Sequence, residues 1–285
     1  LSGDSALSKN SYFQQVVSKL NKENNFFIYI DIQSIIEHIF PKLAQFTEDL
    51  PEAQKNQMEK GLEFTKDYLG AGLSVDLESS DFSVESLLTL KPESKVLKMM
   101  EGVEFNKDLL LGIDKTPLMI LSFAFNFSEY LNLIMGTLPP ENKEIFEETT
   151  KKFYAQIGLD LEKDIIDNMA GSINFGIFDG ENINITNTNT LISIGIKDEN
   201  KATNMMDTMI KNLPSQQQAL IQKEEIMGTD AYVASAGFYR IFTGIKNNSI
   251  FITIGQPMFE TIVSGKTSLG SVSYTHLTLP TKRIV

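Results

Sequence analysis

The fold class is decided by the stretch Leu69-Gly-Ala-Gly-Leu-Ser-Val-Asp76 and, after Glu78-Ser-Ser-Asp81, by Phe82-Ser-Val-Glu-Ser-Leu-Leu-Thr-Leu90. Two β-rich runs separated by a short polar segment are typical of a β-hairpin. A second pair of runs, 172–178 and 190–196, has the same form. Because hairpins place neighbouring strands antiparallel, the sequence predicts an α+β fold, with a mainly antiparallel sheet and helices packed on one face.

The same order of elements occurs twice around these hairpins. The first set has a strand at 26–31, a helix at 34–40 that Pro41 should end, and a helix at 51–66. The second set has a strand at 118–125, helices at 128–135, 141–156 and 160–169, and then the second hairpin. We therefore predict an internal duplication, with residues 1–110 as the first α+β repeat and 111–271 as the second.

Further elements lie before and after these sets. Phe13, Val16, Val17 and Leu20 recur at helical spacing and predict a helix at 11–20. Another helix is expected at 199–213, and strands are expected at 231–234, 238–245 and 249–254. Asn247-Asn248 is typical of the tight turn between the last two strands.

Neither end of the chain reads as a natural terminus. Val272-Ser-Tyr-Thr-His-Leu-Thr-Leu-Pro-Thr281 resembles the translation of a transposase adapter, so we interpret residues 272–285 as a non-native tail. At the other end, residues 1–9 resemble residues 263–271, which close a strand and a helix. We expect the chain to be a fragment of a longer, repeating protein.

Composition limits the classes of function. The net charge of -12 gives no basic stripe for nucleic acid, and no apolar run is long enough to span a bilayer. We expect membrane attachment only through an upstream lipid anchor or helix. Because Cys is absent, disulfides, thiolate nucleophiles and Cys-based zinc sites are excluded.

Two motifs suggest chemistry, but each has a simpler explanation. Ser264-Gly-Lys-Thr267 resembles the end of a phosphate loop, yet Glu260 stands where the first glycine is required, so we predict a simple loop. Asp160, Asp164 and Asp167 lie at helical spacing and could bind a cation or act as paired carboxylates. Carboxylates are also favoured at the first turn of a helix, and we predict that capping role.

The remaining candidates are weaker. Asp179-Gly-Glu-Asn182 with Asn184 lacks the alternating ligands of a calcium loop and indicates a hairpin tip. His38 has no second histidine in the native part and is interpreted as a boundary residue. Methionines at helical spacing are interpreted as core rather than as a binding groove: Met99, Met100, Met205, Met206 and Met209.

Several strings resemble one known family. They are Phe13-Gln-Gln-Val-Val-Ser-Lys-Leu20, Asn25-Phe-Phe-Ile-Tyr-Ile-Asp31, Gly158-Leu-Asp-Leu-Glu-Lys-Asp-Ile165 and Gly171-Ser-Ile-Asn-Phe175. Over most of residues 1–271 the chain is similar to an uncharacterised bacterial family, the domain of unknown function DUF3352. The resemblance implies an exported or surface-attached protein, such as a lipoprotein of the cell envelope, and it carries over no functional residue. Where the family often has an aromatic pair, this sequence has Asp167-Asn168.

The functional hypothesis is a non-enzymatic, extracytoplasmic binding or structural protein with no catalytic residue, cofactor or metal. Its partner would be a protein or an apolar ligand. One alternative is a carrier of an apolar ligand in a dry pocket lined by Phe123, Phe125, Met206 and Phe242. Another alternative is an enzyme whose site lies outside this fragment.

Overall fold

The computed structural model describes residues 6–20, 25–46, 51–78, 81–106, 108–111, 113, 115–179 and 189–265. The described chain divides into two compact units. The first contains the residues up to Lys98 together with Thr137–Pro139, and the second contains 99–136 and 140–265. Each unit is described by itself.

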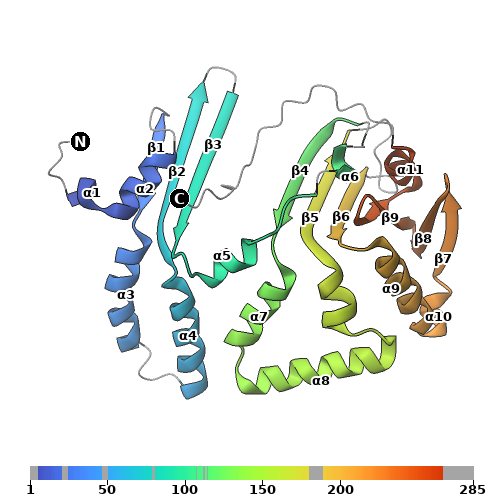
Figure 1. Ribbon diagram of the computed structural model, residues 1–285, viewed down its shortest axis with the longest axis horizontal. Helices are drawn as coiled ribbons and strands as arrows, with labels where there is room; N and C mark the ends of the chain where they lie inside the picture. Colours follow the sequence, from blue (N-terminus) through green and yellow to red (C-terminus); the bar gives the residue numbers. More distant parts are fainter. Residues whose placement is uncertain are drawn as a thin grey trace. The chain divides into compact units, whose positions relative to one another are not determined.

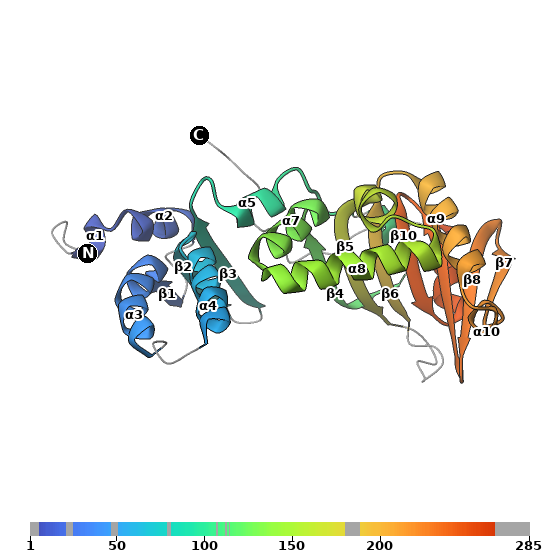
Figure 2. The same cartoon turned by 90° about the horizontal axis from the view of Figure 1, so that it is seen from below.

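The first unit is a three-stranded antiparallel sheet with helices. Its strands are β1 (Phe26–Ile30), β2 (Tyr68–Glu78) and β3 (Asp81–Leu90), in the order β1-β2-β3. Its helices are α1 (Ala6–Lys9), α2 (Ser11–Lys19), α3 (Ile32–Phe46) and α4 (Glu52–Thr65). Helices α3 and α4 connect β1 to β2 and lie side by side (Figures 1 and 2).

Helix α2 covers one face of this sheet. It begins at Asn10, whose side chain accepts a hydrogen bond from the amide of Phe13 at 2.9 Å, as an N-cap residue does. Its buried residue Val16 and the C-cap residue Leu20 pack against the sheet at Gly72, where an added Cβ would lie 2.2 Å from Val16 Cγ1. The helix therefore docks closely because this strand position has no side chain.

The prediction that Pro41 ends the second helix is wrong. Helix α3 continues through Pro41 to Phe46. Proline removes one backbone donor, which costs the helix a single hydrogen bond with Glu37. The apolar residues on both sides of Pro41, including Ile36 and Leu43, keep a helical spacing. The helix therefore continues despite the lost hydrogen bond.

The second unit is a seven-stranded sheet in which all neighbours are antiparallel. The order is β4-β5-β6-β10-β9-β8-β7. Its strands are β4 (Pro117–Ala124), β5 (Met169–Phe178), β6 (Thr190–Ile196), β7 (Ile221–Ile226), β8 (Thr229–Ala236), β9 (Tyr239–Lys246) and β10 (Ser249–Ile254). Its main helices are α7 (Phe127–Thr137), α8 (Pro140–Ile157), α9 (Glu199–Asn212) and α11 (Gln256–Ser264). Shorter helices are α5 (Lys95–Met100), which crosses from the first unit, α6 (Asp108–Leu111) and α10 (Ser215–Gln218).

The α+β class and the antiparallel sheets agree with the prediction, but the helices of this unit do not stay on one face. Phe259 of α11 stacks near Phe242 of β9, with ring centroids 5.8 Å apart. On the other face, Asp207 of α9 accepts a hydrogen bond from Tyr232 of β8 at 2.8 Å. Tyr232 pairs with Thr243, and successive strand residues point to opposite faces. Helices lie on both sides because both faces of this sheet are rich in apolar residues.

Two further details differ from the sequence prediction. The segment at 160–169 is a π-helical turn, η1 (Leu161–Ile165), followed by a 3-10 turn, η2 (Ile166–Asn168), rather than one α-helix. Strand β7 was not predicted, since half of its sequence Ile-Gln-Lys-Glu-Glu-Ile is charged. Charged residues suit an edge strand, and β7 lies at the edge of the sheet.

The two units share one strand plan. In each, a strand is followed by two helices and a hairpin, and the first strand pairs antiparallel with the first arm of the hairpin. The units divide after Lys98, whereas the sequence pattern placed the boundary at residue 110. The common order is what a duplication requires, and the duplication itself stays a prediction.

Candidate functional site

On one face of the sheet of the first unit, the described residues leave large apolar side chains exposed, and we call this face the open face. Register places ten side chains there: Phe26, Ile28, Ile30, Ala71, Leu73, Val75, Leu77, Val84, Ser86 and Leu88. None of these ten is charged. Phe26 is 57% exposed, Ile28 51% and Leu77 51%. A contiguous exposed apolar patch of this kind marks an interaction surface in soluble proteins.

The covered face of the same sheet has the opposite character. Beneath α2, strand β2 presents small residues, Gly70, Gly72 and Ser74, while its large residues Leu73 and Val75 point to the open face. Small side chains admit the helix closely, so β2 buries its small residues beneath α2, while the large residues of the covered face, such as Leu87, come from the neighbouring strands. This arrangement leaves apolar area available for a partner.

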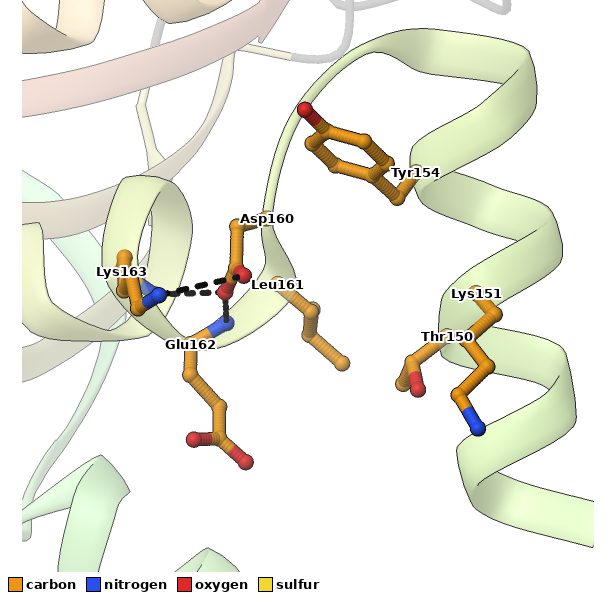
Figure 3. Close-up of a pocket in the computed structure, with 7 residues that line it drawn as sticks. All are labelled: Thr150, Lys151, Tyr154, Asp160, Leu161, Glu162 and Lys163. Atoms are coloured by element: carbon orange, nitrogen blue, oxygen red, sulfur yellow. Dashed lines mark hydrogen bonds and ion pairs between the residues drawn. The ribbon is translucent and has the colours of Figure 1, made fainter.

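A groove of about 460 Å³ lies between α8 and η1 in the second unit. Figure 3 shows Tyr154, Lys151 and Thr150 on the α8 wall, facing the turn that begins at Asp160. Its volume is within the range of small-ligand pockets. The side chains of Leu161, Glu162 and Lys163 form the other wall.

Asp160 in this groove is a capping residue. Its carboxylate accepts hydrogen bonds from the amides of Glu162 and Lys163, both at 3.0 Å. The bond from the Lys163 amide is the main reason that the pKa of Asp160 is lowered from its ordinary value. The lowered pKa keeps this carboxylate ionised as the hydrogen-bond acceptor of the cap.

The three aspartates whose spacing could also suit a cation do not form a common site, and two of them have the predicted capping role. Asp164 accepts a hydrogen bond from the backbone amide of Asp160 at 2.7 Å, which completes the reciprocal cap. Asp167 is exposed, and its carbonyl oxygen accepts from Lys197 Nζ at 2.8 Å. Within the part of the chain that the structure describes, no three His, Asp or Glu side chains could hold a metal ion together. The absence of a cofactor stays a prediction.

The other sequence candidates have local structural roles or lie outside the described residues. His38 is exposed on α3, and its Nδ1 lies 2.7 Å from the carbonyl oxygen of Ser34. Gly265 ends α11 with a φ of 59°, the left-handed cap expected of a glycine, while Lys266 and Thr267 lie outside the described residues. Of the segment Asp179–Asn184, only Asp179 is described, and its amide donates to the carbonyl of Thr116 at 2.8 Å.

The pocket proposed for an apolar ligand is not formed by the residues named for it. Phe242 is fully buried under α11, whereas Phe123 is 49% exposed. Phe123 pairs with Ile173, on the sheet face opposite to Phe242, so the two rings cannot line one cavity. The methionines are also less buried than expected of a core: Met99, Met205, Met206 and Met209 are half-buried, and Met100 is 41% exposed.

A polar network that the sequence did not predict joins α9 to the β7–β8 hairpin. Lys223 Nζ lies 3.0 Å from Asp230 and 3.4 Å from Asp207, and the buried Tyr232 donates to Asp207. Burial, with the hydrogen bond to Asp207, raises the pKa of Tyr232 to about 12. The hydrogen bond to Asp230 raises the pKa of Lys223. The sequence did contain a signal for this network. Asp230 and Tyr232 are two residues apart, so on a strand their side chains lie on the same face, and Lys223 stands opposite Tyr232 on the neighbouring strand.

Together these features define a two-unit antiparallel α+β protein whose most distinctive surface is an uncharged, exposed sheet face. The chain belongs to the DUF3352 family, described as a protein of unknown function, whose model matches residues 1–280. The match agrees with the resemblance seen in the sequence, and it includes residues 272–280 of the tail predicted to be non-native. No curated protein and no solved structure matches the chain. Among the described residues, none of the helices has the length and apolarity to cross a bilayer.

Proposed function

We propose that this chain is a non-enzymatic binding protein that acts outside the cytoplasm and binds its partner through the open face. The observation that carries the proposal is the exposure of large apolar side chains on a face without charge, such as Phe26, Ile28 and Leu88. Fully burying a side chain of this size contributes about 1.5–3 kcal/mol. Covering several half-exposed ones therefore supplies the free energy for a specific complex.

The structural roles of the candidate carboxylates support the non-enzymatic part of the proposal. Asp160 and Asp164 cap a helical turn, and Asp207 and Asp230 hold Lys223. Each therefore has a structural role that explains its position without a reaction.

The extracytoplasmic placement is supported by what the family resemblance implies, with anchoring through a segment upstream of residue 1. The full-length coding sequence tests it directly. A signal peptide, in particular one followed by a lipid-modified cysteine, would agree with the proposal. A cytoplasmic start without any signal would overturn the placement.

The binding surface can be tested with the uncharged fluorescent probe N-phenylnaphthylamine, whose emission rises in apolar surroundings. We expect the probe to bind, and the double variant Ile28→Thr/Leu88→Thr to lower its affinity by about tenfold, since both removed side chains lie on the open face. Threonine is β-branched, a shape that strands favour. The matched control is Leu118→Thr, an exposed leucine of β4 in the other sheet. Equal losses in both variants would contradict the proposal.

A carrier of an apolar ligand is the second candidate, because the lack of charge on the open face suits a ligand that has none. A fluorescent long-chain alcohol distinguishes the two roles. Saturable binding of one molecule per chain, lost in Ile28→Thr/Leu88→Thr, would favour a carrier. Weak and non-saturating binding would favour a protein partner on the same surface.

A further inference from the structure

The part of the second sheet that contains β4, β5, β6 and β10 has an apolar face that the proposed function does not use. Register places eleven side chains on it, on the side of the sheet opposite to Phe242. We call this surface the isoleucine face, and its residues are Met119, Leu121, Phe123, Ile173, Phe175, Ile177, Thr190, Ile192, Ile194, Ile250 and Ile252. None of them is charged, and only Thr190, at one corner, has a hydroxyl or amide group in its side chain.

Two rows of apolar side chains cross the strands on this face. The first row consists of Leu121, Phe175, Ile192 and Ile252, and the second consists of Phe123, Ile173, Ile194 and Ile250. Each row crosses from β4 to β10 over three strand spacings, so it is about 14–15 Å long. An extended hydrocarbon chain advances about 1.2 Å per bond, as the peptide backbone does. A chain of about twelve carbons therefore matches the length of a row.

The isoleucine face is most accessible at β4. There Leu121 is 43% exposed and Phe123 is 49% exposed, and Ile192 in the middle of the first row is still 38% exposed. Beyond β10 the first row continues to Tyr232, where α9 lies on the same side of the sheet and Asp207 accepts a hydrogen bond from the tyrosine. The rows are therefore open at β4 and end at a helix on the other side.

The chemistry of this face selects an occupant without polar groups. The interior strands β5, β6 and β10 have neighbours on both sides, so their backbone groups are used in the sheet. A protein interface contains about one hydrogen bond per 100–200 Å², and the polar groups of a protein partner would find few partners here. A second sheet, which packs about 10 Å above the first, would in addition meet α9 at the end of the rows.

We propose that the isoleucine face binds the hydrocarbon chain of a single neutral lipid, which lies along the rows with its head group beyond β4. The head group is placed there because the other end of the rows is closed by α9. It is neutral because a protein with a net charge of -12 repels a carboxylate or a phosphate. This site is in the second unit and does not depend on the open face, so the inference goes beyond the proposed function.

The test uses the intact chain with its isoleucine Cδ1 methyl groups labelled with ¹³C, and the probe is monolauroylglycerol below its micelle concentration. We expect saturable binding of one molecule per chain, with methyl shifts at Ile192, Ile250 and Ile252. The methyl groups of Ile28 and Ile30, on the open face, are the internal control and should not shift.

Two changes of the probe test the chain and the head group separately. Shortening the chain from twelve carbons should lower the affinity about twofold to fourfold for each methylene removed, since each one is buried on the rows. At low ionic strength the laurate anion should bind more weakly than the glycerol ester. An affinity that does not depend on chain length, or tighter binding of laurate, would overturn the inference.

The double variant Leu121→Thr/Ile192→Thr removes two neighbours of the first row and should lower the affinity about tenfold. The matched control Ile28→Thr/Leu88→Thr changes the same residue types on the open face and should leave it unchanged. Methyl shifts confined to Ile28 and Ile30, or no saturable shift, would overturn the inference. So would a dimer of the chain alone, seen by sedimentation, that the Leu121→Thr/Ile192→Thr variant dissociates, because the occupant would then be a second copy. Failure of the phenylnaphthylamine test at the open face would leave this inference standing.

Discussion

At the scale of single residues, Asn168 shows how one buried amide fixes a corner. Its Nδ2 donates to the carbonyl of Asp198 at 3.0 Å, and its Oδ1 accepts from the amide of Asp198 at 3.0 Å. The residue is 5% exposed, so water cannot replace these bonds. Asn168 thereby joins η2 to the start of α9.

We therefore expect Asn168→Ala to lower the free energy of unfolding by about 1–3 kcal/mol, because the amide of Asp198 loses its partner and the carbonyl of Asp198 keeps only the amide of Ala202. Urea denaturation monitored by circular dichroism measures this difference. Asn204→Ala, at an exposed position of α9, is the control and should change stability by less than about 0.5 kcal/mol. Equal effects of the two variants would contradict the role given to Asn168.

Tyr232 gives a prediction about alkaline pH. Its folded pKa, about 12, exceeds the ordinary value of 10.0, so the folded state holds the phenol proton more tightly than the unfolded state does. The stability from this difference is fully present below pH 10 and is lost as the pH rises towards 12. We expect the wild-type chain to lose stability over this interval more steeply than Tyr232→Phe, as measured by urea denaturation at several pH values. Parallel slopes would show that Tyr232 titrates alike in both states.

At the scale of elements, the docking of α2 on the first sheet depends on a missing side chain. In Gly72→Ala the added Cβ would lie 2.2 Å from Val16 Cγ1 and 2.7 Å from Leu20 Cδ1. We expect this variant to lose about 1–3 kcal/mol of stability through overpacking. The comparison is Gly61→Ala in α4, where an added Cβ meets nothing within 4 Å. That change should instead stabilise the protein by about 0.5–1 kcal/mol, since alanine favours a helix. Thermal unfolding of the two variants decides between packing and a general effect of alanine.

The sequence predicted the structure best where a single spacing of apolar residues, that of a strand or that of a helix, ran through the segment. The alternating runs around 69–90 and 172–196 predicted both hairpins, and the capped helix at 199–213 was found within one residue of its end. It was least informative where two effects competed. At Pro41 the helical apolar pattern prevailed over the lost donor, and in β7 the edge position prevailed over a charged sequence.

The site could be predicted only in part. The capping role of Asp160 was readable, since a carboxylate before a helical turn has a local partner. The open face could not be predicted, because the sequence shows that β1 and β3 are apolar but does not show which face of the sheet a helix covers. That choice is made by Gly72 on one side of β2 and by the contact with Val16, which are far apart in the chain.

At the scale of the whole molecule, we expect the last fourteen residues to contribute nothing to folding. This follows from the adapter-like sequence of residues 272–285. A chain ending at residue 271 should have the same midpoint of thermal unfolding as the full chain, within about 1 °C. For a chain of this size, a loss of about 1 kcal/mol would lower the midpoint by a few degrees, so a contribution of that size would be detected. A large decrease would show that the segment belongs to the folded protein. Removal of residues 256–264, the buried helix α11, is the positive control and should prevent folding.

The pairing of β6 with β10 also has a consequence for how the second sheet folds. Strands β7 to β10 follow one another through tight turns, and Asn247 and Asn248 both have a positive φ that closes the last of them. Such hairpins form in microseconds from neighbouring residues. The join between Gly195 and Ser249 instead brings distant parts of the chain together, which is slow because loop closure precedes the gain from contacts. We therefore expect the C-terminal strands to assemble early as a separate meander, and their attachment along β6 to set the rate at which this unit reaches its native state.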